Sequence, residues 1–105
     1  MRLKLGVKLV DLSSQIVLAA VIVQDAYFKR DPLCSCTITS GNDSKHGDAS
    51  LHSKGRALDF RTHDYHGDVE KLVQDIRDAL GENFDVVLED LNGANEHIHV
   101  EYDPT

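Results

Sequence analysis

The chain carries little positive charge, no long apolar segment and few cysteines, and each of these shortages narrows its class. Its 105 residues hold 11 Lys and Arg against 18 Asp and Glu, a formal net charge of −7. Nucleic-acid recognition usually needs a basic face, so we expect no nucleic-acid partner. The sequence shows no internal repeat and no low-complexity stretch, and its length predicts a single domain over residues 1–105.

The longest apolar run, Ile16 to Val23, is too short to span a membrane. Basic residues precede it, as in a signal peptide, but Asp11 and a polar stretch at 13–15 intervene and no small-residue cleavage site follows. We therefore interpret the run as part of a core helix. We expect no membrane insertion and a monomer that is cytoplasmic as synthesised.

The two cysteines, Cys34 and Cys36, are separated by one residue. A disulfide over this spacing would be strained, which argues against a secreted disulfide scaffold. Such a pair can bind metal, but we favour the simpler interpretation of two small residues that enter a strand.

The first half of the chain predicts one long helix. Asp11 can cap a helix that runs to about Phe28, and Pro32 prevents its continuation. The middle is apolar all round, which suits a buried helix, although its Val and Ile content leaves a strand as an alternative. Residues 1–10 remain unassigned.

The second half predicts one helix and several short strands. The helix covers residues 67–80, with Gly81 as its stop and an apolar stripe formed by Val69, Leu72, Val73, Ile76 and Leu80. Strands are expected at residues 36–40, 56–62, 84–89 and 97–102, and a polar loop at 41–50. This order favours an α+β fold in which helices cover one face of a small antiparallel sheet.

Strand alternation divides the side chains of the two strands between the two faces of that sheet. Leu58, Phe60, Ile98 and Val100 would face the helices, and Asp59, His97 and His99 would share the opposite face. Two histidines and a carboxylate can hold a catalytic zinc ion and leave a fourth position open. We therefore predict His52, Asp59 and His99 as zinc ligands. The alternative is that the His-x-His pair is ordinary polar surface.

A zinc-activated water needs a base, and Glu96 is the candidate. Its odd offset from His99 would turn it to the other face of a regular strand. Glu96 must then lie at an irregular entrance to the strand, after the turn that begins at Asn92-Gly93. We predict that His97 donates a hydrogen bond to the developing oxyanion, with a fourth-ligand role as the alternative.

The run from Ser50 to Asp59 resembles the SxHxxGxAxD signature of the zinc D-Ala-D-Ala peptidase superfamily, which also contains the hedgehog signalling domain. Glu96-x-x-His99 resembles its second signature, and the resemblance spans about residues 36–103. It implies a small α+β domain with zinc on its open sheet face. It also implies His52, Asp59 and His99 as ligands, Glu96 as the acid and base, and His97 as an assisting residue.

The resemblance implies a zinc peptidase that acts on the stem peptides of bacterial peptidoglycan, of the D-Ala-D-Ala carboxypeptidase or L-Ala-D-Glu endopeptidase type. The compact chain would fit a phage endolysin that reaches the cell wall upon lysis. The rival is a non-catalytic, hedgehog-like zinc domain that binds a protein or wall partner. Hedgehog domains lack an acid three residues before the last ligand, so Glu96 favours the hydrolase. A metal-free scaffold is a third alternative.

The chain departs from the family where substrate is held. No arginine follows Ser40-Gly41, where many family peptidases place one. The candidates to replace it are Lys45, Arg30 and Arg56. His46 lies six residues before His52, as in hedgehog domains, and would line the substrate site or belong to the loop surface.

Other polar residues carry weaker expectations. We interpret His63 and His66 as surface or helix-start residues. We interpret Glu89 and Asp90 as surface residues, with a hydrogen bond to a ligand histidine as the alternative.

Overall fold

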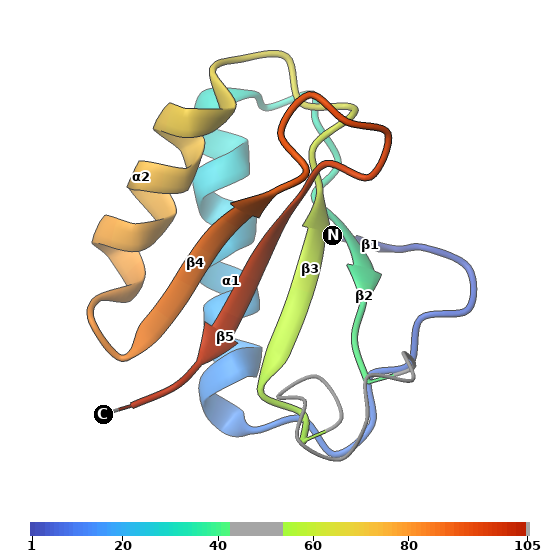
Figure 1. The fold of residues 1–105 in the computed structure, drawn as a ribbon, viewed down its shortest axis with the longest axis vertical. Helices are drawn as coiled ribbons and strands as arrows, with labels where there is room; N and C mark the ends of the chain where they lie inside the picture. Colours follow the sequence, from blue (N-terminus) through green and yellow to red (C-terminus); the bar gives the residue numbers. More distant parts are fainter. Residues whose placement is uncertain (43–53, 105) are drawn as a thin grey trace.

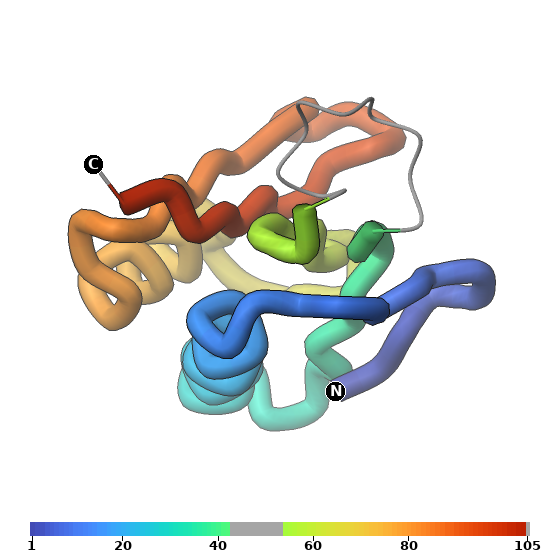
Figure 2. Tube along the Cα trace, turned by 90° about the horizontal axis from the view of Figure 1, so that it is seen from below, coloured from blue at the N-terminus to red at the C-terminus, as the bar shows by residue number. Residues whose placement is uncertain are grey.

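The computed structural model describes residues 1–42 and 54–104. Two helices and five strands follow one another in the order β1 (Arg2–Leu3), α1 (Ser14–Arg30), β2 (Thr37–Ser40), β3 (Ala57–Arg61), α2 (Val69–Leu80), β4 (Phe84–Glu89) and β5 (His97–Tyr102). Both helices lie on one face of the sheet (Figure 1), and the turned view in Figure 2 shows the same two layers. The expected α+β class and the helices on one face are confirmed.

The sheet is mixed, so the expectation of an antiparallel sheet was wrong in one pair. Its strand order is β1-β2-β3-β5-β4, and β1 runs parallel to β2 while the other neighbours are antiparallel. The backbone N–H of Arg2 donates to Cys36 O at 2.8 Å. A parallel pair needs a long crossover connection, and α1 supplies it. The short β1 has no periodicity that sequence reasoning could detect.

Helix α1 begins two residues later than an Asp11 cap would place it. Ser13 is the N-cap, and its hydroxyl accepts the backbone N–H of Ile16 at 3.2 Å. Asp11 has φ of 52°, outside the extended region that an N-cap residue adopts. The helix ends at Arg30, just before Asp31-Pro32.

Only one stripe of α1 is buried, so the expectation of burial all round was wrong. The buried side chains recur at helical spacing: Ile16, Ala19, Ala20, Val23, Ala26 and Tyr27. On the outer face, Leu18 is 65% exposed and Phe28 60%. In a two-layer fold only one side of a helix is covered. The sheet and α2 cover that side of α1. No helix in the described part of the chain meets the length and apolarity of a membrane span.

Helix α2 follows the predicted pattern. Asp68 caps it by accepting the backbone N–H groups of Glu70 and Lys71, and Gly81 ends it with φ of 83°. Its stripe faces the sheet, with Leu72, Val73 and Ile76 buried. An ion pair between Arg30 and Asp75 joins the two helices at their surface.

The sheet face beneath the helices is apolar, as the alternation predicted. Leu58, Phe60, Ile98 and Val100 are each at most 1% exposed. The register pairs Phe60 with Ile98 and Leu58 with Val100 across β3 and β5. This pairing turns the odd-numbered side chains of both strands to the opposite, open face.

Candidate metal centre on the open face of the sheet

The open face is organised in rows that run across β3, β5 and β4. The strand register places Arg61, His97 and Glu89 in one row, and Asp59, His99 and Val87 in the next. A third row holds Ala57, Glu101 and Asp85. Two basic side chains and an acid therefore lie at one end, and two acids lie at the other.

Asp59 and His99 share the open face, as predicted from strand alternation, and the register brings them into direct contact. Their Cα atoms are register partners, and Asp59 Oδ1 lies 2.8 Å from His99 Nδ1. Their side chains are only 14% and 15% exposed, respectively. The two central strands thus hold a nitrogen atom and an oxygen atom that can both act as metal ligands. The two atoms lie side by side in a partly desolvated position.

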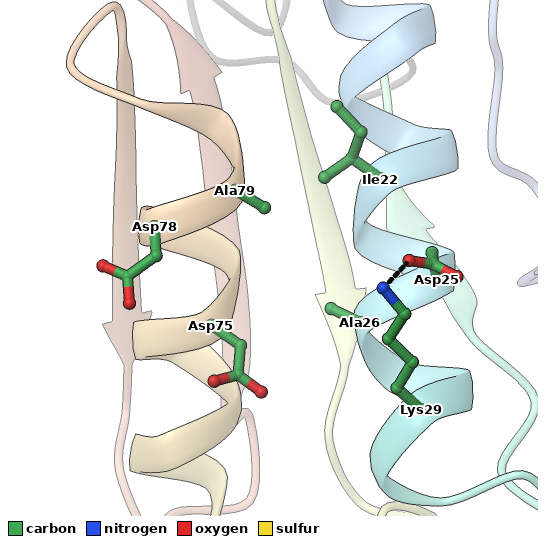
Figure 3. Close-up of a pocket in the computed structure, with 7 residues that line it drawn as sticks. All are labelled: Ile22, Asp25, Ala26, Lys29, Asp75, Asp78 and Ala79. Atoms are coloured by element: carbon green, nitrogen blue, oxygen red, sulfur yellow. Dashed lines mark ion pairs between the residues drawn. The ribbon is translucent and has the colours of Figure 1, made fainter.

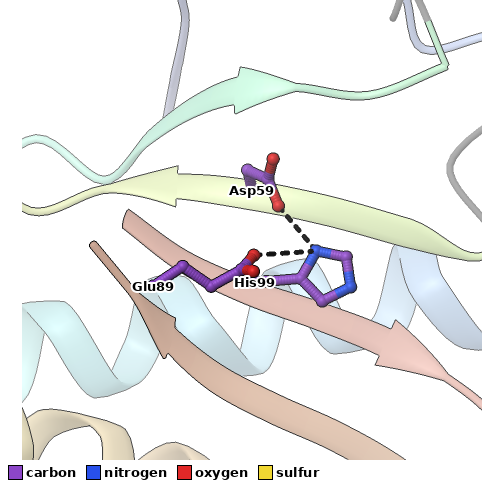
Figure 4. Close-up of side chains that lie close together, drawn as sticks. All are labelled: Asp59, Glu89 and His99. Carbon is purple, nitrogen blue, oxygen red and sulfur yellow. Dashed lines mark hydrogen bonds and ion pairs between the residues drawn. The ribbon is translucent and has the colours of Figure 1, made fainter. Parts of the chain in front are cut away.

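Glu89 joins this pair from β4 (Figure 4). Its Oε1 lies 3.9 Å from His99 Nδ1 and 3.0 Å from His97 Nε2. Asp59, Glu89 and His99 each offer a ligand atom, and these atoms all lie within 4.8 Å of one another. Glu89 is exposed, as expected of a surface residue, and its hydrogen-bond partner on this face is His97.

His99 is held from both sides of its ring. Nε2 lies 2.7 Å from Glu101 Oε1, opposite the Nδ1 contact with Asp59. Burial acts to lower the pKa of His99, but the hydrogen bonds and charges of Asp59 and Glu101 outweigh it and raise the pKa to about 9. In the metal-free protein at neutral pH, both ring nitrogens therefore carry protons and donate to carboxylates.

His97 lies beside this pair, with a side chain 15% exposed. Its Nδ1 donates to the carbonyl of Asn95 at 2.7 Å, which fixes the ring. Nε2 then faces Glu89 at 3.0 Å and Asp59 at 3.8 Å. This arrangement directs one ring nitrogen of His97 toward the Asp59–His99 pair.

Glu96 lies just before β5, at the irregular entrance that its odd offset required. Its carboxylate accepts the hydroxyl of Thr62 and the backbone N–H of Asn92, the latter at 2.8 Å. These two hydrogen bonds hold the pKa of Glu96 below its usual range. Its described contacts include neither Asp59 nor His99, so the structure does not bring Glu96 into the Asp59–His99 cluster.

Three predicted site residues, His52, His46 and Lys45, lie outside the described residues. The structure describes residues 54–59, the end of the first signature. It explains why two of these residues are small. Gly55 has φ of 71°, and a Cβ there would lie 2.3 Å from the carbonyl oxygen of Asp11. Ala57 is fully buried on β3. The glycine thus lets the segment before α1 pass close to the chain just before the metal face.

Asp59, Glu89 and His99 offer the types of ligand that zinc takes. Zinc takes histidine nitrogen and carboxylate oxygen at about 2.1 Å, so two tetrahedral ligands lie about 3.4 Å apart. The Nδ1 contacts of His99 with Asp59 at 2.8 Å and with Glu89 at 3.9 Å lie on either side of that spacing. A zinc ion would take the place of the Nδ1 proton, with Asp59 and His99 among its ligands.

Other features of the described residues suit catalysis less well. Asp85, Glu101 and Asp103 form an acidic group, which is common at surfaces without an ion. The groove between α1 and α2 in Figure 3, about 370 Å³, lies on the helix side, and its Lys29 is already paired with Asp25 at 2.8 Å. His66 is an exposed partner of Asp31, in keeping with a surface role.

The cysteines are free and do not form a reactive pair. Burial raises the pKa of the Cys36 thiol to about 12 and that of Cys34 to about 11. Thiolates are the metal-binding form, and these thiols stay protonated at neutral pH. The structure therefore favours the simpler interpretation, in which Cys36 packs in the core next to β2.

Comparison with protein-family models, curated proteins and solved structures found no match for this chain. The motif residues and the geometry of the open face are the features of this chain that bear on its function.

Proposed function

We propose that this protein is a zinc-dependent peptidase that hydrolyses stem peptides of bacterial peptidoglycan. The observation that carries the proposal is the contact between Asp59 and His99 on two central strands, at 2.8 Å. These two residues are the ligands that the two sequence signatures supply from the described part of the chain. Their contact supports the proposal because it makes the two distant signatures one site.

In the proposed site, His52, Asp59 and His99 hold the metal. The chemistry that a bound zinc supplies there is polarisation of the scissile carbonyl and acidification of water. Glu101 keeps a hydrogen bond to His99 Nε2 and so orients the ring. His97, held through Nδ1 by the carbonyl of Asn95, would direct Nε2–H toward the negative charge that develops on the carbonyl oxygen.

Glu96 is the proposed base and later the acid that protonates the leaving amine. Its lowered pKa keeps the carboxylate charged at neutral pH, the form that accepts a proton. Thr62 and Asn92 hold it at the entrance of β5. To reach the reacting water, the side chain would release the Asn92 N–H and turn toward His97.

The test compares Glu96→Gln with Glu89→Gln in zinc-loaded protein. Digested muropeptides are identified by mass spectrometry, and bound zinc is measured separately. Glu96→Gln should retain about one zinc per chain and lose about 10²- to 10⁴-fold in turnover. Full activity in Glu96→Gln with loss in Glu89→Gln would move the base to Glu89. Zinc-bound wild-type protein that cleaves no muropeptide would eliminate the peptidase.

The second candidate is a non-catalytic zinc domain that binds a protein or wall partner. The position of Glu96 favours it, because both carboxylate oxygens accept hydrogen bonds away from Asp59 and His99. Under this alternative, wild type and Glu96→Gln hold zinc equally and neither cleaves a muropeptide. The same experiment therefore decides between the two functions.

A further inference from the structure

A polar hollow of about 240 Å³ opens at the end of the metal face where β3 and β5 meet the turn before β5. Lys4, Arg61 and His63 contribute its basic side chains, and Glu96 and His97 also line it. The whole chain is acidic, with a net charge of −7. A concentration of basic side chains beside the proposed catalytic residues is therefore unusual for this molecule.

Arg61 is the important side chain in the hollow. It is half-buried, yet its guanidinium has no ion pair and no hydrogen bond within residues 1–42 and 54–104. Two arginines on the helices are engaged: Arg30 pairs with Asp75, and Arg77 donates to the carbonyl of Val86. Arg2 and Arg56 are exposed, whereas Arg61 is half-buried. A guanidinium has five N–H donors in a planar fork that matches a carboxylate.

The backbone of Arg61 is fixed, which gives its side chain a defined origin. Arg61 pairs with His97 in the sheet register, and the backbone carbonyl of Arg61 accepts a hydrogen bond from the hydroxyl of Tyr27 at 2.8 Å. Arg61 also lies two residues after Asp59, on the same sheet face. An anion held by Arg61 would therefore lie about one residue from the bond acted on at Asp59 and His99.

The one carboxylate among the described lining residues, Glu96, does not neutralise Arg61. Its two oxygens are taken by Thr62 and Asn92. His63 is directed by its Nε2 contact with the carbonyl of Ala94 at 3.0 Å. Lys4 adds a second positive charge at the rim. The hollow thus has two cationic side chains, those of Arg61 and Lys4, and favours an anionic guest.

We propose that Arg61, assisted by Lys4, binds the free α-carboxylate of the residue on the amine side of the scissile bond. This inference depends on the proposed function for the identity of the peptide. Both candidate scissile bonds have a residue with a free α-carboxylate on their amine side. A terminal D-Ala has a free carboxylate, and a D-Glu that continues through its γ-carboxyl leaves its α-carboxylate free.

The experiment titrates N-acetyl-D-alanine, and its primary amide as the neutral match, into chelator-treated and zinc-loaded protein. Chemical shifts of backbone amides and of the arginine Nε–Hε groups report binding. Only the carboxylate should bind, and it should shift Arg61 in both forms. Arg61→Met should weaken binding about tenfold or more, because a charge-assisted fork is lost. Arg61→Lys should fall between the two.

Arg56→Met is the matched control. Arg56 was a candidate for the substrate arginine from sequence, but it precedes the same strand at its other end, does not line the hollow and lies over the ring of Tyr102. This variant should bind N-acetyl-D-alanine like wild type. Circular dichroism of each variant verifies its fold. Equal binding of the amide, unchanged binding by folded Arg61→Met and Arg61→Lys, or an equal loss in Arg56→Met would overturn the inference. The protein could bind the carboxylate through Arg61 and yet bind no zinc and hydrolyse no peptide. That result would support the anion site and contradict only the proposed peptidase function.

Discussion

At the scale of single residues, His99 determines what the open face can do. Nδ1 faces Asp59 and Glu89, and Nε2 faces Glu101. A metal on the Nδ1 side leaves Nε2–H as a donor to Glu101, the arrangement that commonly orients ligand histidines. Under the proposed function, Glu101 would therefore be a positioning residue, which the sequence signatures do not include.

Replacement of Glu101 by alanine should lower zinc affinity about 10- to 100-fold while zinc still binds one per chain. Glu101→Gln should lose less, since its amide oxygen still accepts from Nε2. Competition with a chromophoric chelator measures both affinities. Asp103→Asn is the control, because Asp103 belongs to the same acidic group without a described contact with His99. An equal loss in Asp103→Asn would indicate a general charge effect.

Glu96 should make the protein sensitive to acid. The hydrogen bonds of Thr62 and Asn92 hold its folded-state pKa below the ordinary 4.5. A carboxyl group with a lowered folded pKa contributes stability above its unfolded pKa, and the contribution disappears as pH falls through the folded pKa. Urea unfolding between pH 6 and pH 3 should therefore show a smaller stability loss in Glu96→Gln than in wild type. Identical pH profiles would contradict the described hydrogen bonds.

At the scale of helices and strands, local signals predicted most of the fold. The bounds of β4 and β5 match the expected ones, because turns and alternation mark both strands clearly. The start of α1 did not follow from sequence, since Asp11 and Ser13 are both good caps and backbone conformation decides between them. β1 depends on a distant partner, β2, so residues 1–10 gave no local signal for it.

The choice between Asp11 and Ser13 as the N-cap of α1 can be tested directly. Ser13→Ala should reduce the free energy of unfolding by about 1 kcal/mol, because the N–H of Ile16 loses its acceptor. Asp11→Ala should cost much less. Denaturant unfolding at neutral pH measures both changes. A larger loss in Asp11→Ala than in Ser13→Ala would return the cap to Asp11.

The candidate site was predictable only in part, and strand register explains the limit. Alternation along each strand placed Asp59 and His99 on one face. Alternation could not predict that Glu89 and Arg61 would both lie beside His97, one on each neighbouring strand, because cross-strand pairing depends on register. The direction of the Glu96 side chain depends on Thr62 and Asn92, which no motif connects to it.

At the scale of the whole molecule, 105 residues provide a thin core. The sheet has helices on one face only, and the other face carries the polar rows of β3, β5 and β4. A metal that joins residues on this second face to one another would add to the stability of the folded chain.

Removal of zinc should therefore lower the melting temperature. Zinc at about a hundred times its dissociation constant adds about 2.7 kcal/mol, which corresponds to about 10 °C for a domain of this size. Calorimetry with and without chelator measures the change. His99→Ala is the control, and chelator should not alter its melting temperature. An equal effect of chelator on wild type and His99→Ala would mean that the stabilising ion lies elsewhere.

The place of β3 and β5 in the middle of the sheet has a consequence for how the site responds to its ligands. Each of these strands has a hydrogen-bonded neighbour on both sides, whereas β1 and β4 form the edges. Their amides should open last in hydrogen exchange, with the rates of global unfolding. Asp59 and His99 consequently start from a rigid, preorganised spacing, and little conformational entropy is lost when a ligand binds between them.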